Sequence, residues 1–203
     1  TPCGTLFPYT TLFRSKLKDL IDNVLVVSRL EQKLLIYNCT VHNADELIRK
    51  GVEKIRLIYN VDIDYRYDAE EQQKIVFDEM AFGHVLKNLV DNSIKYSTGE
   101  VRVKLRVSQY KKWLRFTYSD NGLGIDAKMR GKVFNKFYRG QNKNNPSVKG
   151  TGLGLYLVKE ILKYHGGKIK IIKPGKEVTG TTFDILLPIF GLKKKRYLKQ
   201  LLD

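Results

Sequence analysis

The chain has 203 residues and a globular composition, with 42% hydrophobic and 29% charged residues and only 5 prolines, which excludes a low-complexity chain. Its formal net charge of +16 favours an anionic partner, either nucleic acid, an acidic membrane or a nucleotide phosphate, or else reflects a solvated basic surface. Two cysteines, Cys3 and Cys39, are too few for a disulfide framework and lack metal-type spacing, and no stretch approaches the ~20 apolar residues that span a bilayer.

The two ends of the chain differ from the rest. Residues 1–15 carry one charge, at Arg14, and show neither helical nor strand periodicity. Their composition is typical of translated adaptor or vector sequence, so we expect an artefact or a disordered start. Residues 191–203 hold five positive charges against one aspartate and form a basic tail. The larger part of the net charge is therefore spread along the remaining sequence.

Residues 16–32 form the first predicted helix. Their apolar side chains recur at helical spacing, at Leu17, Leu20, Ile21, Val24, Leu25 and Val27. A helix of this length is marginal alone and needs a partner helix. We then expect, in order, an extended segment over 34–40, a helix from Asn43 to Tyr59 capped by Asn43 or Asp45, and a strand over 60–67.

The second half of the sequence mixes helices with strand hairpins. The expected elements are a helix over 77–96, strands over 101–108 and 113–119 joined by a turn at 110–112, a polar loop over 121–149, a helix over 151–165, and strands over 168–173 and 181–187. A loop as long as 121–149 in a compact domain is usually functional. This order of elements predicts an α+β sandwich and not a doubly wound α/β fold.

The helix over 77–96 carries a polar stripe opposite its apolar face. His84, Asn88, Asn92 and Tyr96 recur every fourth residue, and Lys95 lies beside them. Asparagine is a weak helix former, so two aligned asparagines need a reason. They are either a solvent-facing stripe or amide oxygens directed at a hydrated Mg²⁺, with Lys95 as a phosphate contact. His84 could cap such a pocket, but we expect an incidental surface histidine.

A glycine-containing stretch, Asp120-Asn121-Gly122-Leu123-Gly124-Ile125, follows directly after a predicted strand. A carboxylate at a strand end can accept a hydrogen bond from an exocyclic amine while the glycine backbone packs closely on a ring. Gly122, Gly124 and Ala127 also fit the dinucleotide-binding fingerprint, but that motif needs a helix opening at the glycines. In this sequence a polar loop, and not a helix, follows the glycines.

A second glycine stretch precedes the helix over 151–165. Gly150, Gly152 and Gly154 would let backbone amides approach phosphate oxygens at the helix N-terminus, or they form a flexible hinge. The Gly-Lys-Ser/Thr ending of a Walker loop is absent. Between the two glycine stretches, residues 133–140 indicate either an anchored aromatic turn with Phe134, Phe137 and Arg139 or a local hydrophobic plug.

The order and spacing of these four stretches resemble the catalytic domain of bacterial sensor histidine kinases. They resemble that family's N box, first glycine box, F box and second glycine box, and residues 180–183 resemble its closing strand near the adenine. The segment Ser28-Arg29-Leu30-Glu31 resembles the second helix of the family's dimerisation and phosphoacceptor hairpin. The resemblance covers about 16–188. It implies a truncated hairpin helix and connector over 16–40 and a catalytic ATP-binding domain over 41–190.

The resemblance implies a two-layer α/β sandwich of the Bergerat type and the residues of its ATP site. Asn92 is implied as the Mg²⁺ ligand, Asp120 as the adenine contact, and Lys95 and Arg139 as cations on the phosphate side. Asn88, Lys95 and Arg139 are the implied catalytic residues. The full nucleotide-binding set is Asn88, Asn92, Lys95, Tyr96, Asp120, Gly122, Gly124, Ile125, Phe137, Gly150, Thr151, Gly152, Leu153, Gly154, Leu155 and Thr181.

One position separates kinase from hydrolase chemistry. Related gyrase, mismatch-repair and chaperone ATPases place a glutamate four residues before the Mg²⁺ asparagine, where it polarises water. Here that position is Asn88, and an amide takes up no proton at neutral pH. Transfer of the γ-phosphate to a protein side chain is therefore favoured. His42, His84 and His165 all lie outside the expected phosphoacceptor context, so we expect the chain to be a fragment without its phosphoacceptor.

The resemblance also implies partners and a location. These are a response regulator receiver domain and a homodimer through the hairpin, with no nucleic acid, in the cytoplasmic part of a parent kinase of the bacterial inner membrane. Three alternatives stay open. The chain could be a degenerate nucleotide- or partner-binding module, a basic nucleic-acid-binding protein with residues 193–196 as its footprint, or a serine kinase of the anti-sigma-factor type on the same fold.

Overall fold

The computed structural model describes residues 36–139, 150–173 and 179–190, together with 17, 21, 23–29, 32 and 34. The chain forms two compact units, residues 1–36 and 37–203. In the first unit, residues 23–29 are helical, within the range of the predicted helix over 16–32. The second unit contains β1 (Thr40–Asn43), α2 (Ala44–Tyr59), β2 (Asp62–Asp68), β3 (Lys74–Phe77), α3 (Glu79–Lys95), β4 (Arg102–Tyr110), β5 (Trp113–Asp120), α4 (Gly154–Tyr164), β6 (Lys168–Ile172) and β7 (Thr182–Pro188).

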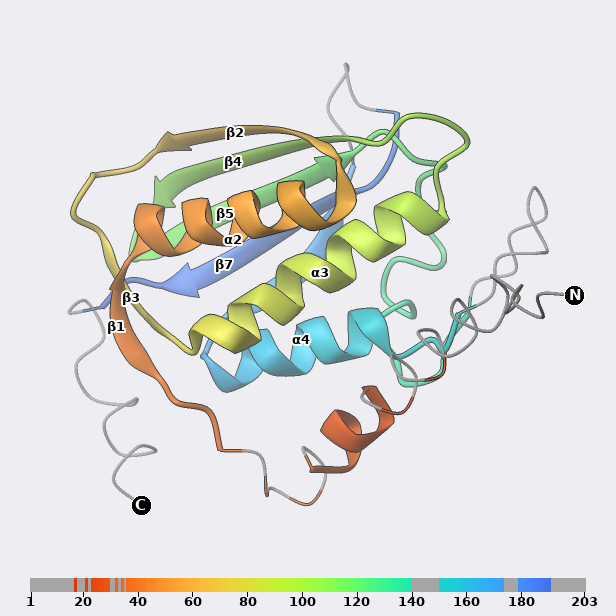
Figure 1. The fold of residues 1–203 in the computed structure, drawn as a ribbon, viewed down its shortest axis with the longest axis horizontal. Coiled ribbons are helices and arrows are strands. Elements are labelled where there is room, and N and C mark those ends of the chain that lie inside the picture. Colours follow the sequence, from red (N-terminus) through yellow and green to blue (C-terminus); the bar gives the residue numbers. More distant parts are fainter. Residues whose placement is uncertain are drawn as a thin grey trace, which may run out of the picture. The chain divides into compact units, whose positions relative to one another are not determined.

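The second unit is a sandwich of one helical layer on one sheet, as Figure 1 shows. The sheet has five strands in the order β2-β4-β5-β7-β6. β2 pairs with β4 in parallel, and the other three pairs are antiparallel. Helices α2, α3 and α4 lie across one face of this sheet. The α+β, two-layer fold predicted from the sequence is confirmed.

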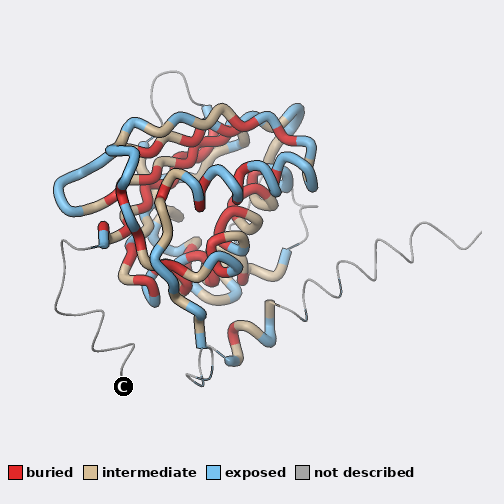
Figure 2. The backbone as a smooth tube through the Cα atoms, turned by 60° about the vertical axis from the view of Figure 1, so that its left-hand side comes forward, coloured by how far each residue is buried: buried red, intermediate tan, exposed pale blue. Residues whose placement is uncertain are grey.

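The core lies between the helices and the sheet, where the buried residues gather in Figure 2. The inward side chains of β4, Val103, Leu105 and Val107, alternate with outward charged or polar residues, which is the period-2 pattern of a sheet with one solvated face. They face the buried stripe of α3, which includes Leu86 and Leu89. Among the described residues, no helix is both long and apolar enough to cross a membrane.

Local sequence explains where the helices begin. Asn43 caps α2, since its side-chain oxygen accepts a hydrogen bond from Glu46 N at 3.2 Å. Asp78 caps α3 in the same way by accepting from Ala81 N at 2.8 Å, and its second oxygen accepts from Asn38 N at 2.7 Å. Asp78 therefore ties the segment before β1 to the start of α3.

The sequence did not predict the short sheet made of β1 and β3. These strands pair in antiparallel register from Thr40 opposite Phe77 to Asn43 opposite Lys74. The predicted extended segment over 34–40 ended where β1 starts, and Phe77, assigned to a helix, belongs to β3. The helix predicted from residue 151 begins instead at Gly154, because Gly152 has a φ of +70°, which is not helical.

Candidate functional site

The centre of the site is the carboxylate of Asp120, which ends β5 and is 6% exposed. Its Oδ1 accepts hydrogen bonds from Gly122 N and Thr181 N, both at 2.9 Å. Its Oδ2 accepts from Ser93 Oγ at 3.1 Å. An ionised carboxylate has about four acceptor positions, so three are filled and one remains on Oδ2. That remaining position can accept a hydrogen bond from a ligand.

Two glycines let the backbone close around this carboxylate. A Cβ atom on Gly180 would overlap the backbone oxygen and Oδ1 of Asp120 and the backbone nitrogen of Gly122. A Cβ on Gly122 would lie 2.9 Å from Tyr96 O and 3.1 Å from Asp120 Oδ1. Both positions exclude any side chain, because the atoms they would meet are backbone atoms or a buried, bonded carboxylate.

Ser93 was not among the predicted site residues, and Gly180 was predicted only as part of the closing strand over 180–183. Ser93 lies on the buried face of α3, where its single hydroxyl proton is shared between Asp120 Oδ2 and Leu89 O, each at 3.1 Å, and its oxygen lies 2.9 Å from Tyr118 Oη. A polar residue on an otherwise apolar helical face is a signal that could have identified it. Burial raises the pKa of Tyr118 well above its usual value, so this phenol stays neutral next to the carboxylate.

The polar stripe of α3 presents its two asparagines differently. Nδ2 of Asn88 donates to His84 O at 2.8 Å, so this amide is used by its own helix. Nδ2 of Asn92 is buried and has no hydrogen-bond partner among the described residues. Burying an unpaired amide is costly, and turning it over exchanges its nitrogen for its oxygen. Asn92 therefore offers a polar group that the fold itself does not use.

The two glycine stretches, the asparagine helix and the aromatic turn converge in space. A Cβ on Gly154 would lie 2.8 Å from Asn88 Oδ1, and a Cβ on Gly152 would lie 2.7 Å from Phe137 C. Phe137 itself has a φ of +60°, a strained value for a residue with a side chain. The second glycine stretch is thus packed between α3 and the aromatic turn.

The remaining predicted residues surround this centre. Leu123 N donates to Tyr96 O at 2.9 Å, which joins the first glycine stretch to the end of α3. Leu153 is buried and donates its N–H to Thr151 Oγ1 at 3.2 Å. Gly124 has a φ of +74°, Ile125 and Leu155 pack against the core, and Phe134 is buried within it. The N-terminus of α4 has no side-chain cap among the described residues, and a helix N-terminus favours an anion.

The two predicted cationic residues, Lys95 and Arg139, lie at exposed positions. The side chain of Lys95 is exposed and makes no hydrogen bond or ion pair within the described part of the chain. Arg139 is also exposed and is the last residue described before residues 140–149. Gly150 is exposed, with nothing within 4 Å of a Cβ placed on it. Residues 140–149 of the predicted loop over 121–149, and all of the basic tail over 191–203, lie outside the described residues.

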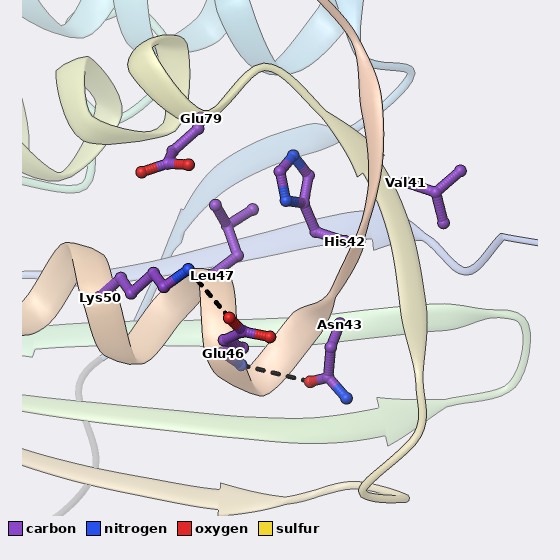
Figure 3. A pocket seen from close by; sticks show the side chains of 7 residues that line it. All are labelled: Val41, His42, Asn43, Glu46, Leu47, Lys50 and Glu79. Atoms are coloured by element: carbon purple, nitrogen blue, oxygen red, sulfur yellow. Dashed lines mark hydrogen bonds and ion pairs between the residues drawn. The ribbon is translucent and has the colours of Figure 1, made fainter.

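A pocket elsewhere on the second unit has a different character. It lies between β1 and the first turns of α2 and α3, with a volume of about 130 Å³ (Figure 3). Its polar groups bond to one another, since Lys50 Nζ lies 2.9 Å from Glu46 Oε1 and Asn43 caps Glu46 N. Glu79 lines it at the start of α3, roughly 20 Å from Ser93 at a rise of about 1.5 Å per residue. We assign no ligand to it.

The histidines differ in exposure. His84 is exposed on α3, and His165 is 3% exposed at the end of α4. The ring of His165 stacks on Phe77 with centroids 3.7 Å apart. Its Nδ1 donates to Ile161 O at 2.7 Å, and its Nε2 accepts from Asp78 N at 3.2 Å. Loss of solvation on burial lowers its pKa, so His165 is a neutral structural residue.

Comparison with known proteins identifies a family and relatives to which the chain is similar. Residues 77–190 match the family described as "Histidine kinase-, DNA gyrase B-, and HSP90-like ATPase". The sensor-like histidine kinase SenX3 of Mycobacterium tuberculosis is 30% identical over 176 residues, which cover 86% of this chain and 42% of SenX3. The chain thus spans less than half the length of this relative.

Solved structures of two kinases share the fold. The mycobacterial sensor histidine kinase MprB has a TM-score of 0.60 and 28% identity, over 74% of this chain and 97% of that one. The catalytic domain of histidine kinase ThkA has a TM-score of 0.58 and 30% identity, over 74% of this chain and 95% of that one. ThkA has also been solved in complex with the response regulator protein TrrA, with a TM-score of 0.67 and 24% identity, over 93% of this chain and 52% of that one.

Proposed function

Because this chain belongs to the family of histidine kinase-, DNA gyrase B- and HSP90-like ATPases, we propose that residues 41–190 bind ATP with Mg²⁺ and donate its γ-phosphate to a histidine of a two-component signalling protein. The observation that carries the proposal is the Asp120 carboxylate. It is buried, held by three protein donors and left with one acceptor position. An exocyclic amine such as that of adenine fits this position.

The amide of Asn92 supports a role for Mg²⁺. Its buried nitrogen has no hydrogen-bond partner in the part of the chain that the structure describes, and Mg²⁺ prefers oxygen ligands such as a turned amide supplies. The residue therefore fits the metal. Bound Mg²⁺ would neutralise charge on the nucleotide phosphates, and Lys95 and Arg139 would add further positive charge on the phosphate side.

The glycine residues before α4 support phosphate binding. Gly152 and Gly154 press against Phe137 and Asn88, so this backbone approaches the site closely. The uncapped first turn of α4 directs N–H groups and the positive end of the helix dipole outward. We assign the phosphates of ATP to this turn, with Thr151 and Leu153 in the preceding segment.

Asn88 supports phosphoryl transfer over hydrolysis. Its amide donates to His84 O, and neither amide atom can take a proton from water at neutral pH. Residues 41–190 therefore position ATP and neutralise the charge of its phosphates. The acceptor histidine belongs to a hairpin outside the described domain. A response regulator receives the phosphoryl group, as the ThkA–TrrA complex suggests. We place the domain in the cytoplasm, as part of a membrane-anchored sensor dimer.

Nucleotide titration tests the site. We expect the unmodified chain to bind ATP in the presence of Mg²⁺ and to prefer it over GTP, whose ring presents a carbonyl where adenine has its amine. Asp120→Asn turns the remaining acceptor into a donor and should remove this preference. Asn92→Ala should remove the dependence of binding on Mg²⁺. Unchanged ATP affinity in both variants would refute the site.

Radiolabelled ATP tests the reaction class. We expect no label on the chain alone, because His42, His84 and His165 lie outside a phosphoacceptor context, and label on an added hairpin that carries such a histidine. Nucleotide binding without any transfer to an added hairpin would favour the alternative, a degenerate binding module without kinase activity.

A further inference from the structure

Aromatic and cationic residues meet at the turn between β4 and β5. The residues are Tyr110, Lys111, Lys112, Trp113, Lys168 and Phe190, and we name them the tip patch. Tyr110 pairs with Trp113 across the two-residue turn, and Trp113 pairs with Pro188 on β7. Ile189 N donates to Lys112 O at 3.4 Å, which brings the end of the domain to the same turn.

The tip patch exposes apolar and charged groups together. Tyr110 is 47% exposed and Phe190 is 51% exposed. Lys111, Lys112 and Lys168 are exposed as well, and no member of the patch is acidic. Asp184 on β7 is held in ion pairs with Arg115 and Lys170. The exposed acids Asp68 and Glu70 lie beside Ser108 and Gln109 at the same end of the sheet but are not part of the patch. The patch therefore has a net positive charge around exposed aromatic rings.

Two rings of the tip patch, those of Tyr110 and Trp113, have the protein's own cations beside them. Lys111 Nζ lies 5.7 Å from the Tyr110 ring centroid, and Arg115 Cζ lies 5.9 Å from it. Lys168 Nζ lies 5.5 Å from the Trp113 centroid. Single-stranded nucleic acid binds by stacking bases on free aromatic faces, so this arrangement does not favour it. Aromatic rings beside lysines are instead typical of the interface between a bilayer and water.

We propose that the tip patch binds the surface of a bilayer that contains anionic phospholipid. Its lysines attract the negative surface, since each cation near such a surface strengthens binding about fivefold. Its aromatic side chains reach the headgroup level. The sequence continues from Phe190 through Leu192 into Lys193, Lys194, Lys195 and Arg196, which adds positive charge directly after the patch.

The position of the tip patch leaves the candidate ATP site accessible. β5 begins at Trp113 and ends at Asp120, which separates the two by roughly 23 Å at about 3.3 Å per residue. A bilayer at one end of this strand does not cover the carboxylate at the other. The proposal is therefore independent of the proposed kinase function, and either can fail without the other.

Vesicle binding by the full chain tests the proposal. Trp113 is the only tryptophan of the chain, so its fluorescence reports on the patch directly. We expect sedimentation with vesicles of phosphatidylcholine and phosphatidylserine but not of phosphatidylcholine alone. We also expect a blue shift of the Trp113 emission, quenching by brominated lipid, and weaker binding at high salt.

Matched double variants locate the binding surface. Lys111→Gln with Lys112→Gln should lower the partition coefficient about 25-fold, from about fivefold per lysine. The control is Lys50→Gln with Lys54→Gln, which removes the same charge from α2 on the opposite face of the sheet and should have little effect. All four lysines are exposed, so thermal unfolding should change little in either variant.

Four results would overturn the proposal. The first is equal binding to neutral and anionic vesicles, and the second is an equal loss in the two double variants. The third is loss of binding when residues 193–196 are replaced by glutamine, with no effect of the Lys111 and Lys112 change. The fourth is patch-dependent binding of oligothymidylate or polyglutamate by a chain that does not bind anionic vesicles, which would identify a nucleic acid or an acidic protein as the occupant.

Discussion

Gly180→Ala tests whether close packing around Asp120 creates the nucleotide site. The added methyl group would overlap the backbone oxygen and Oδ1 of Asp120 and the nitrogen of Gly122. None of these atoms is the end of a flexible side chain, so the structure can make room only by moving the carboxylate. Asp120 would then lose the hydrogen bonds from Gly122 N and Thr181 N.

The expected effects follow from these contacts. Overpacking a dense site costs about 1–3 kcal/mol, and each hydrogen bond to a charged group contributes about 1.5–3 kcal/mol. Partial relaxation should leave a loss of about 3 kcal/mol in the free energy of unfolding, measured by urea denaturation. Displacing the acceptor should weaken ATP binding about 100-fold, or about 2.7 kcal/mol, by calorimetry.

A second glycine-to-alanine variant is the control for the general effect of adding a methyl group. Gly131→Ala adds the same methyl group where nothing lies within 4 Å of it, and it should leave both quantities nearly unchanged. If Gly180→Ala bound ATP as tightly as Gly131→Ala, the carboxylate would not need its observed position. The role given to Asp120 would then be wrong.

Three further variants probe the start of α4, the buried His165 and the cap of α3. Gly154→Ala places a methyl group 2.8 Å from Asn88 Oδ1, the end of a side chain that can turn away, so the free energy of unfolding should fall by about 1 kcal/mol. Its ATP affinity should drop more clearly than that of Gly150→Ala, where the methyl group is unopposed. The lowered pKa of His165 means that stability is fully present above its unfolded value of about 6.5 and falls as the pH drops below it. Urea denaturation should show this loss between about pH 7 and pH 5, and His165→Gln should reduce it. Asp78→Ser keeps one acceptor for the cap of α3 but removes the acceptor for Asn38 N, and calorimetry should show a loss of about 1 kcal/mol; a loss much larger than this would indicate that the cap itself had failed.

The elements with a strong local signal were predictable from the sequence. α3 was recognised from its apolar stripe and β4 and β5 from strict alternation, because each pattern lies within one continuous segment. β1 and β3 have four residues each, and their pairing joins Thr40 to Phe77. Neither strand has enough residues for a clear period, so only the tertiary structure establishes this sheet.

The candidate site also contains residues that were predictable from the sequence and residues that were not. The asparagines and the glycine stretches were predicted because residue type and spacing alone indicate their chemistry. Gly180 and Ser93 act through contacts with Asp120, and the Ser93 hydroxyl bonds a carboxylate 27 residues further along the chain. Gly180 is needed because another backbone approaches it closely, a requirement that depends on how β5 and the segment before β7 come together.

Asn88 has a packing role in the fold and also bears on the type of reaction that is proposed. One of its amide atoms donates to His84 O within α3, and the other lies against Gly154 at the start of α4. A glutamate at this position could take a proton from water, whereas an amide cannot. The same side chain thus lies between the two helices that carry the proposed Mg²⁺ and phosphate contacts. It provides no base that could activate water at this position. In the proposed function, the described domain holds and orients ATP, and the nucleophile for its γ-phosphate comes from a separate protein segment.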